Sequence, residues 1–173
     1  MRRKEKGIAF IIISIVIIFL ILNASGVFGV PVDRLEQDAR KSQKIDASWD
    51  VSKADNDEIG ALLFYSKQAD KFVFSIYLNR PGLSYGYFFR SGGAIGDIMD
   101  GVAEFSYGSN GAALISMNSP QISKIEFRNE KVSAIEIDPL KPFAVTIPRN
   151  CDSFAMYDIN GEVIPVTNVF VNN

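Results

Sequence analysis

The chain contains no histidine and a single cysteine, and these two shortages exclude whole classes of function. Without imidazole no catalytic triad or dyad can use histidine as its base, and the usual zinc and copper ligand sets are incomplete. Cys151 has no second cysteine for an intrachain disulfide, so the fold must rest on its apolar core. The sequence therefore offers no metal site and no cofactor site, and it favours a protein that is not an enzyme.

The chain also lacks a basic surface pattern. The net charge of the whole chain is −2. Without the first six residues, the chain has 14 basic and 19 acidic residues and a net charge of −5. Nucleic-acid binding needs a basic stripe or patch, so we expect no nucleic-acid partner. The same acidic balance weakens any case for direct binding of anionic lipid head groups by the residues that follow.

Long apolar runs are equally scarce, with one exception at the N-terminus. Residues 7–22 read GIAFIIISIVIIFLIL, with no charge and only one polar residue, and four basic residues and one acid stand among the first six. This pattern predicts a transmembrane signal-anchor over residues 7–28 and a cytoplasmic head over residues 1–6. By the positive-inside rule the rest of the chain lies outside a single-pass cell membrane.

A cleaved secretory signal is the alternative interpretation of the same segment. Ala24-Ser25-Gly26 would serve as the small-residue cleavage site that such a signal needs. The apolar stretch is at or beyond the usual upper length of a signal peptide and is unbroken by glycine or proline until Gly26, which favours the anchor. Both interpretations place the remaining chain outside the membrane, and they differ in whether it is tethered or secreted.

The rest of the chain is long enough for one domain with its own core. Residues 33–44, DRLEQDARKSQK, form a charged juxtamembrane linker. Leu35 and Ala39 stand four apart, which suits a short helix, but two apolar residues bury too little to hold one, so a solvated spacer remains equally open. We expect an extracytoplasmic β domain over residues 45–167 and an aperiodic tail over residues 168–173.

Alternation of apolar and polar residues recurs through this domain at intervals of about ten residues. Strands are expected over residues 45–51, 61–65, 72–78, 83–89, 102–107, 112–118, 121–127, 132–137, 143–147, 154–159 and 162–166. Residues 61–89 predict a three-stranded meander with a type II turn at Pro81-Gly82, and Asn160-Gly161 predicts a two-residue hairpin. The fold class is therefore all-β, an antiparallel two-sheet sandwich of immunoglobulin-like shape.

Two motifs that resemble ligand sites fail on detail. Asp55, Asp57 and Glu58 suggest calcium, but the loop lacks the glycine and the bidentate glutamate of an EF-hand, so a solvated turn over residues 53–58 is the default. Residues 91–101, SGGAIGDIMDG, suggest a phosphate loop but contain no Gly-Lys-Ser/Thr. We expect a flexible connection between sheets there.

The leading functional hypothesis is a non-catalytic interaction or accessory module of the bacterial cell envelope, with the membrane and an envelope protein as partners. Candidate binding residues are Tyr77, Phe88 and Arg90, large side chains predicted to share one face of the meander. The opposite face is expected to be core and carries Phe72, Phe74, Tyr85 and Tyr87. A purely structural role for both faces, each covered by a sheet, is the alternative.

Three further functions remain open. A secreted binding domain follows if the N-terminal segment is cleaved. A hydrolase without histidine would need a carboxylate pair, such as Asp97 with Asp100, or a serine and a lysine, such as Ser116 with Lys124. A regulator would have to act through its membrane helix, because a six-residue head cannot form a signalling domain.

Overall fold

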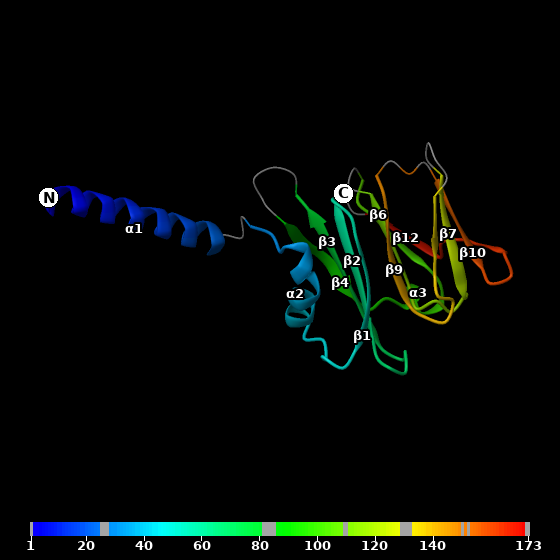
Figure 1. Cartoon of the computed structure of the whole chain (residues 1–173). Helices are drawn as coiled ribbons and strands as arrows, with labels where there is room; N and C mark the ends of the chain where they lie inside the picture. Colours follow the sequence, from blue (N-terminus) through cyan, green and yellow to red (C-terminus); the bar gives the residue numbers. More distant parts are fainter. Residues whose placement is uncertain are drawn as a thin grey trace.

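The computed structural model describes residues 2–24, 28–80, 86–108, 111–128, 133–149, 151 and 153–171. Within these ranges the chain is mostly β, with few helices, and Figure 1 shows the helix α1 projecting away from the β part. The helices are α1 (Arg2–Ala24), η1 (Val32–Arg34), α2 (Leu35–Ser42) and α3 (Gly96–Asp100). The prediction of a β-rich fold is confirmed.

The strands form three four-stranded sheets. Sheet A has the order β1 (Asp50–Asp55), β2 (Ile59–Tyr65), β3 (Phe72–Asn79), β4 (Tyr87–Gly93). Sheet B has the order β12 (Asn168–Val171), β5 (Ala103–Ser106), β6 (Ala112–Ser116), β9 (Phe143–Ile147). Sheet C has the order β11 (Val163–Ile164), β10 (Ser153–Asp158), β7 (Ile122–Arg128), β8 (Ser133–Glu136). The predicted number of two sheets is therefore wrong, and the β12–β5 pair is parallel where all pairs were expected to be antiparallel.

Sheet B is the middle layer, and its two faces build two separate cores. Ala113 and Ile115 of β6 face sheet A, while Ala112 and Leu114 face sheet C. All five residues of β6 are buried. A strand covered on both faces reads as a continuous apolar run instead of an alternation. The apolar run AALI of β6 is thus the sequence pattern expected of a strand that is covered by a sheet on each side.

The predicted meander is confirmed in β2, β3 and β4, which pair in antiparallel order. Phe72, Phe74 and Ile76 share the face of β3 that packs against sheet B, as their alternation indicates. Residues 81–85, which hold the predicted type II turn and Tyr85, lie outside the described residues. β1 adds a fourth strand to this sheet along β2.

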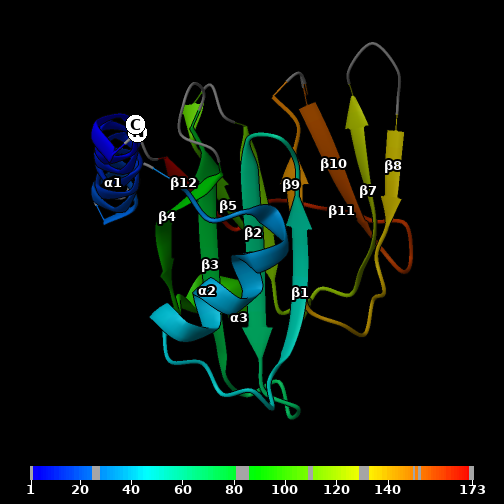
Figure 2. The same cartoon turned by 60° about the vertical axis from the view of Figure 1, so that its left-hand side comes forward.

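The outer face of sheet A is covered by α2, as Figure 2 shows. Leu35 and Ala39 are 4 % and 0 % exposed and pack against Leu62 and Phe64 of β2. Beyond the helix end, the Gln43 side-chain amide donates hydrogen bonds to the Phe74 carbonyl and to the Ser75 hydroxyl. Of the two alternatives for residues 33–44, the structure thus shows the helix, and it lies on the sheet.

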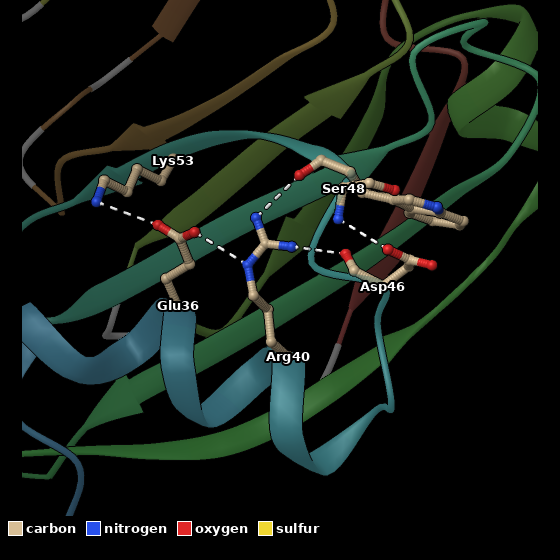
Figure 3. A network of polar contacts seen from close by, with 6 residues as sticks. Glu36, Arg40, Asp46, Ser48 and Lys53 are labelled. Carbon is tan, nitrogen blue, oxygen red and sulfur yellow. Dashed lines mark hydrogen bonds and ion pairs between the residues drawn. The ribbon is translucent and has the colours of Figure 1, made fainter.

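Arg40 fastens α2 to the turn that precedes β1 (Figure 3). Its guanidinium donates to the carbonyls of Asp46 and Trp49, each at 3.0 Å, and to the Glu36 carboxylate at 3.0 Å. The guanidinium carbon also lies 4.8 Å from the centre of the Phe64 ring. Arg40 thus links α2 to this turn through hydrogen bonds to two backbone carbonyls.

Several strands and loops begin or end at other residues than the sequence predicts, because contacts between distant parts of the chain set these boundaries. The strand expected over residues 45–51 begins only at Asp50, and β1 then continues to Asp55 through the predicted break. The expected loop over residues 91–101 contains the end of β4 and the short helix α3. The expected tail contains β12, which pairs with β5. The expected hairpin at residues 160–161 forms, but only Gly161 has a positive φ (+81°), as in a three-residue loop with a left-handed final residue.

The chain meets sheet A soon after α1. Val30 and Tyr87 form an isolated antiparallel bridge, with N–H to carbonyl distances of 2.7 and 2.8 Å, so Val30 extends the β4 edge. The approach is close: a Cβ added to Gly29 would lie 2.5 Å from the Gly86 carbonyl carbon. A side chain at position 29 would therefore push the two backbones apart.

Replacing Gly29 by alanine should open this bridge while leaving the sheets folded. We expect the amide of Tyr87 to exchange with deuterium at least about tenfold faster, because opening the bridge makes local unfolding at this amide easier. A tenfold change corresponds to a decrease of roughly 1.4 kcal/mol in the free energy of local opening. Native-state hydrogen exchange measures this. Gly96→Ala is the matched control, since a Cβ there meets nothing within 4 Å, and equal protection in both variants would contradict the close approach.

Candidate binding wedge between sheets B and C

The structure separates the three predicted binding residues. Tyr77 is fully buried beneath α2, and its hydroxyl donates to Asp38 at 2.8 Å. Burial, with the hydrogen bond to Asp38 as the next cause, raises the pKa of Tyr77 above its ordinary value. The ring also meets Phe89 edge-on, with centroids 5.6 Å apart. Tyr77 therefore belongs to the interface between α2 and sheet A and is not available on a surface.

Phe88 and Arg90 do not share a face with Tyr77. The register pairs Tyr77 with Phe89 and Leu78 with Phe88, so Phe88 lies on the side of Leu78. Tyr87, expected in the core with Phe74, packs with Tyr77 against α2 instead. Arg90 is the extra residue of a β-bulge and is exposed. The predicted shared face is thus wrong, because the structure pairs Leu78 with Phe88 and so places Phe88, and not Tyr87, on the side of Leu78.

Phe88 is half-buried, and the Arg80 guanidinium carbon lies 4.4 Å from the centre of its ring. This contact gives Phe88 a local packing role.

The residues considered for catalysis are held by structural contacts. Ser116 is fully buried in sheet B, where its hydroxyl donates to the Gly101 carbonyl at 2.5 Å and accepts from the Asn118 N–H at 2.8 Å. Lys124 lies in sheet C and pairs with Glu126 at 2.8 Å. Ser116 is therefore not placed as a nucleophile for an external substrate.

The carboxylates considered for calcium or for hydrolysis are exposed or partly exposed. Among the described residues no group of three or more cysteine, aspartate and glutamate side chains lies in a position to hold a metal ion. Asp97 accepts a hydrogen bond from the Asn168 amide at 3.2 Å, which ties α3 to β12.

A pocket of about 400 Å³ opens between sheets B and C. Its lining includes Glu104 and Ser106 of β5, Ala112 of β6, Ile147 of β9, Cys151, and Phe154 of β10. The alternation of β5 places the two polar residues here, because Ala103 and Phe105 are committed to the core between sheets A and B. We call this pocket the wedge.

Glu104 is the chemically distinctive residue of the wedge. Its side chain is half-buried, and no hydrogen bond or ion pair to it is found among the described residues. Burial raises the pKa of the Glu104 carboxyl above its ordinary value. A carboxylate that loses water without gaining a partner is held at a cost in free energy.

Arg149 and Cys151, the other ionisable residues of the wedge, have partners. The Arg149 guanidinium lies 3.7 Å from Glu58, a residue outside the wedge. The Cys151 thiol donates to the Ser153 carbonyl at 3.1 Å and is half-exposed. Among the described residues, no basic side chain forms an ion pair with Glu104, so the charge of its carboxylate is uncompensated.

Two exposed valines extend the wedge along β12. The register places Val169 beside Glu104 and Val171 beside Ser106 on the same face of sheet B. Their side chains are 48 % and 66 % exposed. Next to the carboxylate lies an apolar strip that sheet C does not fully cover. The sequence analysis does not single out Glu104 or Ser106, because the alternation of their strand carries no signal that a third sheet half-covers them.

A second exposed apolar surface is on α1. Its large apolar side chains from Ile8 to Leu22 are mostly more than half exposed, Phe10 at 72 %. In the part of the chain that the structure describes, no helix has both the length and the apolar character needed to cross a membrane. The transmembrane helix expected over residues 7–28 is therefore not supported.

Comparison with known protein families, curated proteins and solved structures gives no match for this chain. Its function must be argued from its own surfaces.

Proposed function

We propose that the protein is a non-catalytic interaction module of the cell envelope, held at the membrane through α1, with its β part on the extracytoplasmic side. The observation that carries this proposal is the exposed apolar surface of α1, which stands away from the β part (Figure 1). Apolar surface of this extent is unfavourable in water and marks a contact with lipid or protein. The four basic residues ahead of the apolar run favour a cytoplasmic N-terminus.

The connection between α1 and the β part supports a tether of limited reach. Five residues separate Ala24, the last residue of α1, from Val30, which pairs with Tyr87. A chain of that length spans at most about 20 Å when fully extended. Within a few residues α2 then packs on sheet A. Such a tether keeps the β part close to the end of α1 and suits the binding of a partner at the membrane surface.

Intact mass and cell fractionation test the proposal against secretion. The full chain with a C-terminal tag is produced in a bacterial host, and its mass is measured in each fraction. We expect the full-length mass in the membrane fraction. A mass shortened by residues 1–26, found in the soluble extracytoplasmic fraction, would overturn the tether and establish a secreted binding domain instead.

A further inference from the structure

Glu104 is fixed in its half-buried position by the strand that carries it. The neighbouring Phe105 packs against Phe74 at a centroid distance of 4.6 Å and stacks on Phe170 at 5.0 Å, on the opposite face of sheet B. Because successive side chains of a strand point to opposite faces, these contacts hold Glu104 toward sheet C. The backbone of β5 thus fixes the face of sheet B from which the Glu104 side chain projects, and on that face the described residues give its carboxylate no ion-pair partner.

The space beside Glu104 suits one kind of group. The pocket of about 400 Å³ is at the lower end of the range for ligand pockets, roughly 300–1,000 Å³. Ala112, Ile147 and Phe154 give it apolar walls. Lysine and arginine side chains combine an apolar stem with a cationic end, so the stem would contact these walls while the charge meets the carboxylate. Arg149 also lines this pocket, but its guanidinium lies 3.7 Å from the Glu58 carboxylate, and among the described residues no ion pair joins it to Glu104.

The exposed valines indicate the shape of the segment that brings the basic side chain. Val169 and Val171 stand two residues apart beside Glu104 and Ser106. In an extended segment the side chains of one face also recur every second residue. A segment with apolar residues two positions before and after a basic one would thus place all three against this face.

We propose that the wedge binds a lysine or arginine side chain, carried on an extended segment of a partner protein, with Glu104 as the residue that receives the charge. This inference names the chemistry of the partner and so rests on the proposed function. Charge complementarity carries it: the wedge presents an uncompensated carboxylate between apolar walls.

The test uses the full chain in micelles of an uncharged detergent and the peptide acetyl-Val-Ser-Lys-Ser-Val-amide as probe. Binding is followed by the carbon-13 shift of the Glu104 carboxyl group in glutamate-labelled protein and by calorimetry. We expect saturable binding that weakens at least about tenfold when norleucine replaces lysine, because norleucine keeps the stem and lacks the charge.

Glu104→Gln should weaken binding of the lysine peptide by a similar factor and leave the norleucine peptide unaffected, which is the non-additivity expected of a direct pair. Glu136→Gln removes the same charge from an exposed position on β8 and should change neither affinity. Thermal melting checks the fold: Glu104→Gln should melt at the same or a higher temperature, since it removes an uncompensated charge.

Any of three results would overturn this inference. The protein could bind the two peptides with equal affinity, or Glu104→Gln could bind the lysine peptide as tightly as the unchanged protein does. The third result is that the lysine peptide does not bind at millimolar concentration. The measurement in micelles does not depend on where the protein lies in a cell. If the protein is tethered but does not bind the peptide, only the proposed binding by the wedge is contradicted. If the protein is secreted but binds the peptide, only the proposed tether is contradicted.

Discussion

If α1 holds the protein at the membrane as proposed, glutamate in place of both Ile13 and Ile17 should move the protein out of the membrane fraction. These side chains are 56 % and 50 % exposed on α1. An acidic side chain placed in the apolar interior of a bilayer costs roughly 2.5–3.5 kcal/mol, so two of them lower membrane partitioning by about a thousandfold or more. The share of tagged protein that sediments with membranes measures the effect.

The double replacement Ile13→Leu and Ile17→Leu is the control, because it keeps the apolar character of α1. The β part should melt at the same temperature in all three proteins, since the described apolar side chains of α1 belong to none of the buried cores. A double-glutamate protein that still sediments with membranes would show that another part of the chain holds it there.

Arg40→Ala should lower the free energy of unfolding by about 2–3 kcal/mol. The change removes the charged donor to the carbonyls of Asp46 and Trp49, and hydrogen bonds to charged groups contribute roughly 1.5–3 kcal/mol. The ion pair with Glu36 adds little, because both side chains are partly exposed. Urea denaturation followed by circular dichroism and by the fluorescence of Trp49, the single tryptophan, measures the change.

The neighbouring Lys41→Ala is the matched control, since Lys41 is exposed and forms no ion pair among those found in the described residues. It should change stability by less than about 0.5 kcal/mol. If Arg40→Ala costs no more than this control, the carbonyl contacts of Arg40 contribute little, and α2 is held by Leu35, Ala39 and the hydrogen bonds of Gln43 and Asp38.

The sequence predicts those parts of the fold whose pairing is local. β2, β3 and the start of β4 are rich in apolar and aromatic residues and are joined by short connections, so both their existence and their order follow from residues 59–93. The same holds for the hairpin at Gly161, where a left-handed residue is required. Pro142 and Pro148 flank β9, which is an edge strand of its sheet, as their missing N–H groups suggest.

Pairing between segments that lie far apart in the sequence cannot be predicted in the same way. β12 joins β5 in parallel across more than sixty residues, and nothing within Asn168–Val171 specifies that partner. α2 buries only Leu35 and Ala39, and its other contacts with the β part come from Arg40, Gln43 and Asp38, which read as solvated residues in the sequence. Tertiary contacts decide such segments, because local propensity is weak there.

The candidate site shows the same limit. Alternation correctly predicted that Tyr77 points away from the face of Phe72 and Phe74, but it could not show that a helix from another part of the chain covers it. Glu104 likewise stands on the polar face of its strand and would be expected in solvent. Its lack of a partner depends on sheet C and on the space between the sheets, which only the folded arrangement defines.

Cysteine labelling in intact cells tests the extracytoplasmic tether most directly. Cys151 is the only cysteine, so Leu140→Cys in a Cys151→Ser background gives one reporter at a position that is 81 % exposed. In a host with a single membrane, the account predicts that a membrane-impermeant maleimide labels this protein on intact cells and that the labelled protein stays with the membrane fraction. Labelling that occurs only after the cells are permeabilised would place the β part in the cytoplasm and contradict the account.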